Sequence, residues 1–200
     1  MEAIVNKHGQ RVGRKGAATR LRLIQAASDL LEKGTVNLSP GHIASAAGVS
    51  SASFYLYFCD IREIELALSR VARDDLLQLI DLLDFPANAA DLEDRCLHFV
   101  EAYTARWIQH RQVLRLRNFR ADAGDADFLQ VRSETGMPFI QKIALGIAAC
   151  CPDPQTAQAR AIVFYASLDR LSVAAHQRTN FPTPELMRAE AHVLALLYRH

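Results

Sequence analysis

The sequence predicts an all-α fold, with an N-terminal unit of three helices followed by a larger helical domain. Three observations lead to this prediction. Apolar residues recur every three or four positions along most of the chain, which is the spacing of amphipathic helices. Capping residues, glycines and prolines separate these stretches in the way that helix starts and stops require. No run of alternating apolar and polar residues is long enough to predict a strand.

Composition narrows the class of protein further. Half of the 200 residues are hydrophobic and 22% are charged, which excludes a disordered chain. The longest apolar run, Ile143 to Cys151, is nine residues, too short to cross a membrane. The first thirty residues contain no stretch like that of a signal peptide, so we expect a cytoplasmic protein. The four cysteines lack a CxxC motif and zinc-ligand spacing, so we expect free thiols, no metal and no cofactor.

Basic residues are concentrated at the N-terminus. Residues 1–28 contain six Lys or Arg and one Glu, whereas residues 61–200 contain sixteen basic and eighteen acidic side chains. This asymmetry fits an N-terminus that meets a polyanion, and it fits a solubilising tail equally well. Residues 1–17 contain three glycines among the basic side chains and predict a flexible arm.

Cap and stop signals divide the rest of the chain into helices. Thr19, Ser39, Ser50 and Asp60 are each placed to cap a first turn, and glycines or a proline follow the expected ends. The ranges expected in the N-terminal part are 19–33, 40–47, 51–58 and 61–83. Those expected beyond it are 91–109, 111–120, 125–150, 155–177 and 183–199. Pro138 predicts a kink or a split in the third of these later helices.

Residues 39–58, SPGHIASAAGVSSASFYLYF, predict two short helices joined by a tight turn at Gly48. Ile43, Phe54 and Phe58 are spaced to pack both helices against the preceding one. This is the layout of a helix-turn-helix, whose second helix fits the major groove of DNA. The outer face of that helix carries the hydroxyl groups of Ser50, Ser51, Ser53, Tyr55 and Tyr57. Hydroxyls at a helix N-terminus suit phosphate oxygens, which favours DNA binding over a polar helix pair without such a role.

The segment from Thr19 to Leu68 resembles the DNA-binding domain of the TetR family of transcriptional regulators. The matching motifs are IA..AGVS at residues 43–50 and SFYLYF at residues 53–58, each in the same relation to the flanking helices. The resemblance covers about a quarter of the chain. It implies a helix-turn-helix DNA-binding domain at residues 18–60 and a helical ligand-binding and dimerisation domain at residues 61–200. It further implies a homodimer on a palindromic operator, in which a small effector shifts the long helix and releases the DNA, as a repressor does.

The resemblance also implies roles for particular residues. Positions that contact phosphates or press on the DNA backbone in the family are occupied here by Ser39, Ser53, Tyr55 and Tyr57. Positions that read bases are occupied by Gly41, Ser51 and Ala52, and arm residues Arg11, Arg14 and Lys15 supplement them. Ile61 stands where the family commonly has a phosphate-binding lysine, so Arg62 is expected to take over that contact.

In the C-terminal domain, large side chains of mixed polarity are the candidates for an effector pocket. They are His98, Tyr103, Trp107, Phe119, Phe128, Met137, Phe164 and Tyr165. Each of them is explained at least as well by ordinary core packing, and as a set they indicate an apolar or aromatic ligand. Arg115, Arg117 and Arg120 form a basic cluster that suits either an anionic ligand or a solvated face.

The last two expected helices are apolar on more than one face, so each needs more than one neighbour. The neighbours are either the chain's own helices or a second copy, and the resemblance favours a second copy in a four-helix bundle. No GxSxG, HExxH or GxGxxG motif is present, so we do not expect an enzyme. A protein that coats DNA needs a larger basic surface than a net charge of +1 provides. A thiol-based redox regulator is an alternative, and it requires a reactive Cys59 beside the helix-turn-helix.

Overall fold

The computed structural model describes residues 13–35, 37–84, 86, 89–151, 153–176 and 183–199. Within these ranges the chain forms nine α-helices and one 3-10 helix, without a strand, so the predicted all-α fold is confirmed. The chain divides into two compact units. The first comprises Met1–Val71 and Gln112–Phe128, and the second Ala72–Arg111 and Leu129–His200. The first unit is larger than the DNA-binding domain expected from the sequence, because it also takes in residues 61–71 and 112–128.

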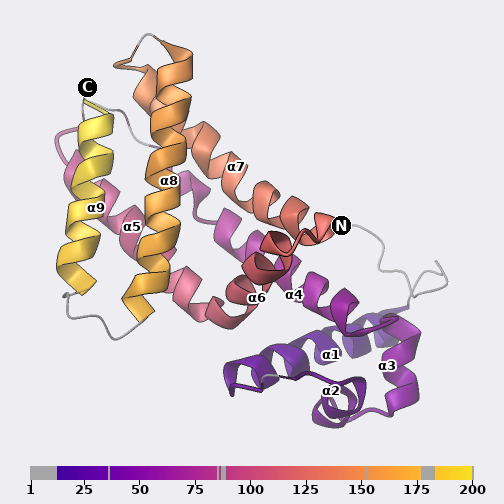
Figure 1. Ribbon diagram of the computed structural model, residues 1–200. Coiled ribbons are helices and arrows are strands. Elements are labelled where there is room, and N and C mark those ends of the chain that lie inside the picture. The colour runs from indigo at the N-terminus through magenta and orange to yellow at the C-terminus, as the bar shows by residue number, and fades with distance from the viewer. Residues whose placement is uncertain are drawn as a thin grey trace. The chain divides into compact units, whose positions relative to one another are not determined.

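The first unit contains the helices around the predicted helix-turn-helix (Figure 1). They are α1 (Arg14–Glu32), α2 (Pro40–Ala46), α3 (Ser51–Tyr57), the first part of α4 (Ile61–Leu77) and α6 (Arg111–Asp122). Its core contains the side chains of Leu23, Ile43, Phe54, Phe58 and Ile64, all without exposed surface. The Arg20 guanidinium lies over the Phe58 ring, 5.0 Å from its centroid.

The N-terminal end of α1 differs from the prediction. The helix begins at Arg14, and Thr19 lies inside it with its hydroxyl donating to the Lys15 carbonyl at 3.0 Å. A threonine can bond back in this way within a helix, so it does not have to be a cap. Arg14 and Lys15 therefore lie in the first turn of α1 and not on an arm, while Arg11 lies outside the described residues. The predicted stop is confirmed, since Gly34 follows α1 with φ +83°.

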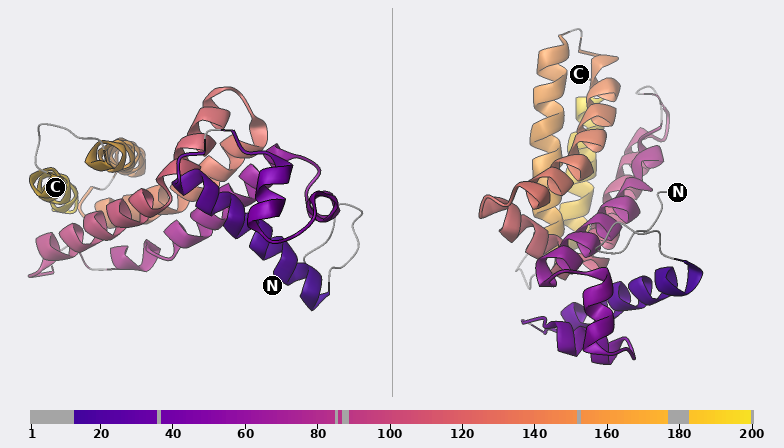
Figure 2. Two further views of the ribbon diagram at one scale, coloured as in Figure 1. Left: turned by 90° about the horizontal axis from the view of Figure 1, so that it is seen from below. Right: turned by 90° about the vertical axis from the view of Figure 1, so that its right-hand side faces the viewer.

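The second unit is a helical body. It contains the end of α4, the 3-10 helix η1 (Ile80–Leu83), α5 (Leu92–Gln109), most of α7 (Ala126–Ala148), α8 (Pro154–His176) and α9 (Thr183–Leu197). Helices α8 and α9 run side by side and both pack on α5 (Figure 1; Figure 2). Among the described helices, none has the length and apolar character needed to cross a bilayer.

Two predicted helix boundaries in this part of the chain need correction. The long helix ends at Leu77 and is followed by a 3-10 turn, so it does not continue as an α-helix to Leu83. Helix α7 is not split at Pro138, which lies inside a continuous helix of 23 residues. Proline lacks an N–H, so the helix forgoes one backbone hydrogen bond there, while Thr135 and Phe139 on either side of it are buried.

Candidate DNA-binding surface and effector pocket

Two serine caps shape the helix-turn-helix. The Ser39 hydroxyl accepts from the His42 N–H at 3.3 Å and starts α2, with Pro40 in its first turn. The Ser50 hydroxyl accepts from the Ser53 N–H at 3.2 Å and starts α3. Between the helices Gly48 has φ +66°, a conformation that a side chain disfavours. The local sequence signals therefore produce the predicted motif, and they fix the start of α3, where candidate base contacts begin.

The structure brings the expected base-reading residues together on the outside of the motif. Gly41, Ser51 and Ala52 are all exposed. A Cβ built on Gly41 would lie 3.9 Å from the Ser51 hydroxyl oxygen, so the start of α2 and the start of α3 are adjacent. Glycine at this position keeps the approach to the α3 N-terminus open.

The expected backbone contacts differ among themselves in exposure. Tyr55 is 44% exposed, and its ring packs edge-on against Phe54, with 5.4 Å between centroids. Ser39, Ser53 and Tyr57 are half-buried. The Ser53 hydroxyl is 3.0 Å from the Ser50 hydroxyl, so it already shares a hydrogen bond within the protein. Of these four residues, Tyr55 therefore presents the most accessible hydroxyl-bearing side chain.

Arg62 has partners inside the protein. Its guanidinium donates to both Asp125 oxygens at 2.7 Å and to Asp127 at 2.6 Å, and it lies 5.7 Å from the Phe128 ring centroid. These hydrogen bonds hold the pKa of Asp125 below its usual range. Two carboxylates beside the guanidinium compete with any phosphate for it. The geometry therefore favours Arg62 as a link between α4 and the α6–α7 turn over its expected role at the DNA.

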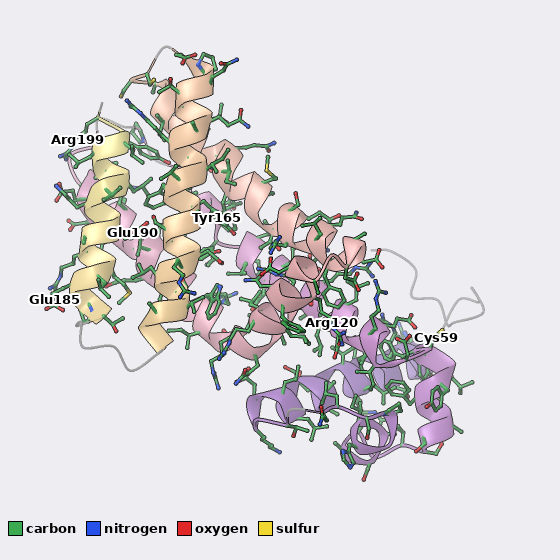
Figure 3. The ribbon with its side chains drawn as sticks, in the orientation of Figure 1. Cys59, Arg120, Tyr165, Glu185, Glu190 and Arg199 are labelled. Carbon is green, nitrogen blue, oxygen red and sulfur yellow. The ribbon has the colours of Figure 1, made fainter. Side chains whose placement is uncertain are left out.

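A second ion pair joins the same helices one turn further along α4. The Glu65 carboxylate is buried and accepts from Arg120 of α6 at 2.8 Å. Arg120 is labelled in Figure 3. Burial raises the pKa of Glu65, and the charge of Arg120 opposes that rise. Removing Arg120 would leave a buried carboxylate without its cation, which is a costly arrangement. Sequence spacing carried no sign of this pair, because its members are 55 residues apart.

Aromatic side chains of the second unit form a compact cluster. It consists of Phe99 and Tyr103 on α5, Phe139 on α7 and Tyr165 on α8. Neighbouring ring centroids are 5.5 to 6.1 Å apart, and the hydroxyls of Tyr103 and Tyr165 are 2.9 Å apart. A Cβ on Gly136 would lie 2.9 Å from the ring of Tyr165, which is labelled in Figure 3, so a larger residue there would force that ring to shift. In this structure the cluster is packed core.

The expected effector residues do not all meet in that cluster. Tyr103 and Tyr165 belong to it, while Trp107 is buried nearby on α5 and donates its indole N–H to Asp169 at 3.1 Å. The remaining candidates are placed as follows: Phe164 is buried on α8, Met137 is half-buried on α7, Phe128 and Phe119 belong to the first unit, and His98 is exposed on α5. The effector residues expected from the sequence did not include Phe99, Phe139 or Asp169. Phe99 could have been found, because it stands one helical turn before Tyr103 and shares its face.

The cysteines and metal sites can be assessed for the described residues. Cys59 and Cys150 are exposed, and none of the four cysteines forms a disulfide. Burial raises the pKa of the Cys96 thiol to about 12, so it stays protonated and unreactive at neutral pH. Within the described ranges, no three His, Cys, Asp or Glu side chains are grouped so as to hold a metal ion.

The arrangement defines a class of protein, namely a helix-turn-helix unit joined to a helical body. No family model matches the sequence, and neither does any curated protein. Solved structures do match. A TetR-family transcriptional regulator from Streptomyces coelicolor is 21% identical with a TM-score of 0.75, covering 93% of this chain and 82% of its own.

Two further solved structures also match over most of both chains at low sequence identity. A transcriptional regulator from Rhodococcus sp. Rha1 is 20% identical with a TM-score of 0.66, covering 90% of this chain and 93% of its own. The multidrug binding protein EbrR, solved in complex with imidazole, is 20% identical with a TM-score of 0.60, covering 88% of this chain and 93% of its own. The chain therefore has the fold of the TetR-family transcriptional regulators, as its helix-turn-helix motifs predicted.

Proposed function

We propose that the protein is a sequence-specific DNA-binding transcriptional regulator that acts as a homodimer and responds to a small molecule. The observation that carries this proposal is the outer face of α2 and α3. Two serine caps hold this face in place, Gly41 leaves the start of α3 accessible, and Ser51, Ala52 and Tyr55 project from it. Polar groups at the start of a recognition helix are the ones that reach base edges and phosphates.

Dimerisation supplies the DNA affinity that a single helix-turn-helix does not provide. The base-reading set is small, because Ala52 offers a methyl group and Gly41 offers no side chain at all. Two copies that bind two half-sites about one helical turn apart, ~34 Å, combine two weak contacts into one stronger one. Such a dimer selects a two-fold symmetric operator. We assign the protein the role of a repressor, released when an effector changes the spacing of the two motifs.

The effector is proposed to be apolar or aromatic and to enter the second unit at the aromatic cluster. The cluster is packed core in this structure, so its rings must part to admit an effector. The Tyr103–Tyr165 hydroxyl pair then offers the polar group that an otherwise apolar small-molecule site typically contains. The effector must bind the released state more tightly than the DNA-bound state, since equal affinities shift nothing. We expect helix α4 to transmit the effect of ligand binding, because its residues belong to both units.

Selection of bound duplexes from a random DNA pool at physiological salt tests the proposal. We expect enrichment of one two-fold symmetric sequence. Retention of DNA without enrichment would mean that electrostatic contact alone holds the duplex, and would contradict sequence reading. Absence of retention, in preparations freed of small molecules by refolding, would contradict DNA binding itself. The enriched site then serves as the probe for effector screening, in which release of the duplex is measured.

A further inference from the structure

A cleft lies within the first unit, between the end of α1 and one face of α6. Its volume is about 380 Å³, which is in the lower range of pockets that hold small molecules. The residues that line it are Leu31, Gly34, Thr35, Gln112, Arg115, Leu116 and Phe119. None of these residues belongs to the DNA-binding face or to the aromatic cluster. Phe119 was expected among the effector residues of the C-terminal domain, but it lies in the first unit.

The two walls of the cleft follow from local structure. Gln112, Arg115, Leu116 and Phe119 are spaced by three, one and three residues, so they form one stripe along α6. The opposite wall is the closed turn after α1. There the N–H groups of residues 34 and 35 donate to the carbonyls of residues 31 and 30, at 2.9 and 3.0 Å. Because these carbonyls already have donors, the end of α1 does not offer the cleft a strong set of acceptors.

The charge of the cleft comes from Arg115. No acidic side chain lines it. Of the three arginines in the basic cluster predicted from the sequence, Arg117 is buried against Asn118 and Arg120 is paired with buried Glu65. Arg115 is exposed, and it has no ion pair or side-chain hydrogen bond in the part of the chain that the structure describes. The lining of the cleft therefore carries one solvated cation and no acidic group.

The apolar part of the cleft contains an aromatic ring that is largely exposed to solvent. Phe119 is 69% exposed, although it follows α6 residues that are well buried on the other face. Leu31 and Leu116 adjoin it in the lining and are half-buried. A flat apolar group placed against Phe119 would remove this surface from water, which is favourable, and two aromatic rings gain from offset or edge-on packing.

We propose that this cleft is a binding site for a small aromatic carboxylate. The carboxylate lies on the Arg115 guanidinium, whose fork matches its two oxygens. The ring of the ligand packs against Phe119 and Leu116, and Thr35 and Gln112 offer neutral hydrogen-bonding groups at its edge. The site is distinct from the aromatic cluster of the second unit, and binding to it can be measured without DNA, so its test does not depend on the proposed function.

Titration calorimetry with benzoate on the full-length protein is the first experiment. We expect saturable binding of benzoate, with benzyl alcohol and acetate each binding at least tenfold more weakly, because one lacks the charge and the other the ring. Arg115→Gln should weaken benzoate binding tenfold or more. Arg170→Gln is the matched control, an exposed arginine on α8 whose removal should leave the affinity unchanged.

A local reporter completes the test. Phe119→Trp keeps an aromatic ring in the cleft and adds a fluorophore, while Trp107 is buried in the second unit. Benzoate should change the emission of Phe119→Trp and leave that of the parent protein constant. The proposal is overturned if benzoate fails to bind at millimolar concentration, if Arg115→Gln binds it as the parent does, or if only the Trp107 signal responds.

Discussion

Ser51 and Tyr55 lie one turn apart on α3, and in the proposed complex they make different kinds of contact. Ser51 stands at the first position of the helix, beside Gly41, where a side chain reaches base edges. Tyr55 lies further along the helix, with its ring packed edge-on against Phe54 and its side chain exposed. A base contact changes which sequence is bound, whereas a backbone contact changes how tightly any sequence is bound.

Ser51→Ala should therefore alter the DNA sequence that is selected, with the largest change at one or two positions of each half-site.

Tyr55→Ala should weaken binding to every DNA sequence by about two- to tenfold, the range of one ordinary hydrogen bond. Tyr55→Phe is the control that keeps ring packing and removes the hydroxyl. Binding curves on the selected duplex and on a scrambled one measure both effects. An unchanged selected sequence for Ser51→Ala would count against base reading by this residue.

Arg62 stands next to the position where the family commonly has a phosphate-binding lysine, but its guanidinium is bonded within the protein. Because Asp125 and Asp127 hold its guanidinium, we expect Arg62→Gln to lower the free energy of unfolding and to leave the salt dependence of DNA binding unchanged. Asp125→Asn should destabilise the protein in the same direction. If Arg62 instead binds phosphate, Arg62→Gln will reduce the salt slope by about one and Asp125→Asn will not.

The Arg62 pair also predicts a pH dependence. The pKa of Asp125 is lower in the folded protein than in the unfolded chain, so its ionised form favours folding. This stabilisation is present above the unfolded pKa, about 4, and is lost as pH falls through the folded value. The difference in stability between the parent and Arg62→Gln should therefore shrink as pH falls below about 4. Urea denaturation at a series of pH values measures it, and a constant difference would contradict the assignment.

At the scale of elements, the helices could be predicted from sequence because their signals are local. Ser39, Ser50, Gly34 and Gly48 act on the turn in which they stand, and each is found in its predicted role. The start of α1 was missed because Thr19 satisfies its hydroxyl by back-bonding within a helix. The partners of Arg62 and Arg120, by contrast, are more than fifty residues away in sequence, and only the packed chain reveals them.

Gly146 of α7 packs very close to the side chain of Tyr198. A Cβ on Gly146 would lie 2.5 Å from the Tyr198 ring, whose side chain is almost completely buried. Gly146→Ala should therefore destabilise the protein by about 1–3 kcal/mol, the usual cost of overpacking. Gly41→Ala is the matched control for stability, because the nearest atom to its added methyl is 3.9 Å away. Thermal unfolding should show a lower midpoint for Gly146→Ala alone, and equal midpoints for both variants would refute the close approach.

At the scale of the whole molecule, the proposed dimer depends on apolar surface that the chain does not bury itself. Val163 on α8 is 70% exposed, and Val193 and Leu196 on α9 are exposed as well. The Ser167 hydroxyl donates to Glu190, which fixes the register of the two helices. Helices α8 and α9 run antiparallel (Figure 1), so Val163, one turn before Ser167, is level with Val193, about one turn after Glu190. We expect these valines to contribute to one apolar area across both helices, as a four-helix bundle between two copies requires.

Val163→Glu should convert the dimer into a monomer. The exposed side chain tolerates a charge in the free subunit, whereas in the interface two symmetry-related glutamates would be desolvated and close to each other. Leu145→Glu is the comparison, because Leu145 is 71% exposed on α7, outside α8 and α9. Sedimentation equilibrium should give a monomer for Val163→Glu and a dimer for Leu145→Glu, with circular dichroism confirming that both stay helical. A palindromic operator binds two linked motifs more tightly than a single one. Val163→Glu should therefore also lose most of its DNA affinity, although it carries no change in α2 or α3. A dimeric Val163→Glu, or a monomeric Leu145→Glu beside it, would place the interface elsewhere on the surface.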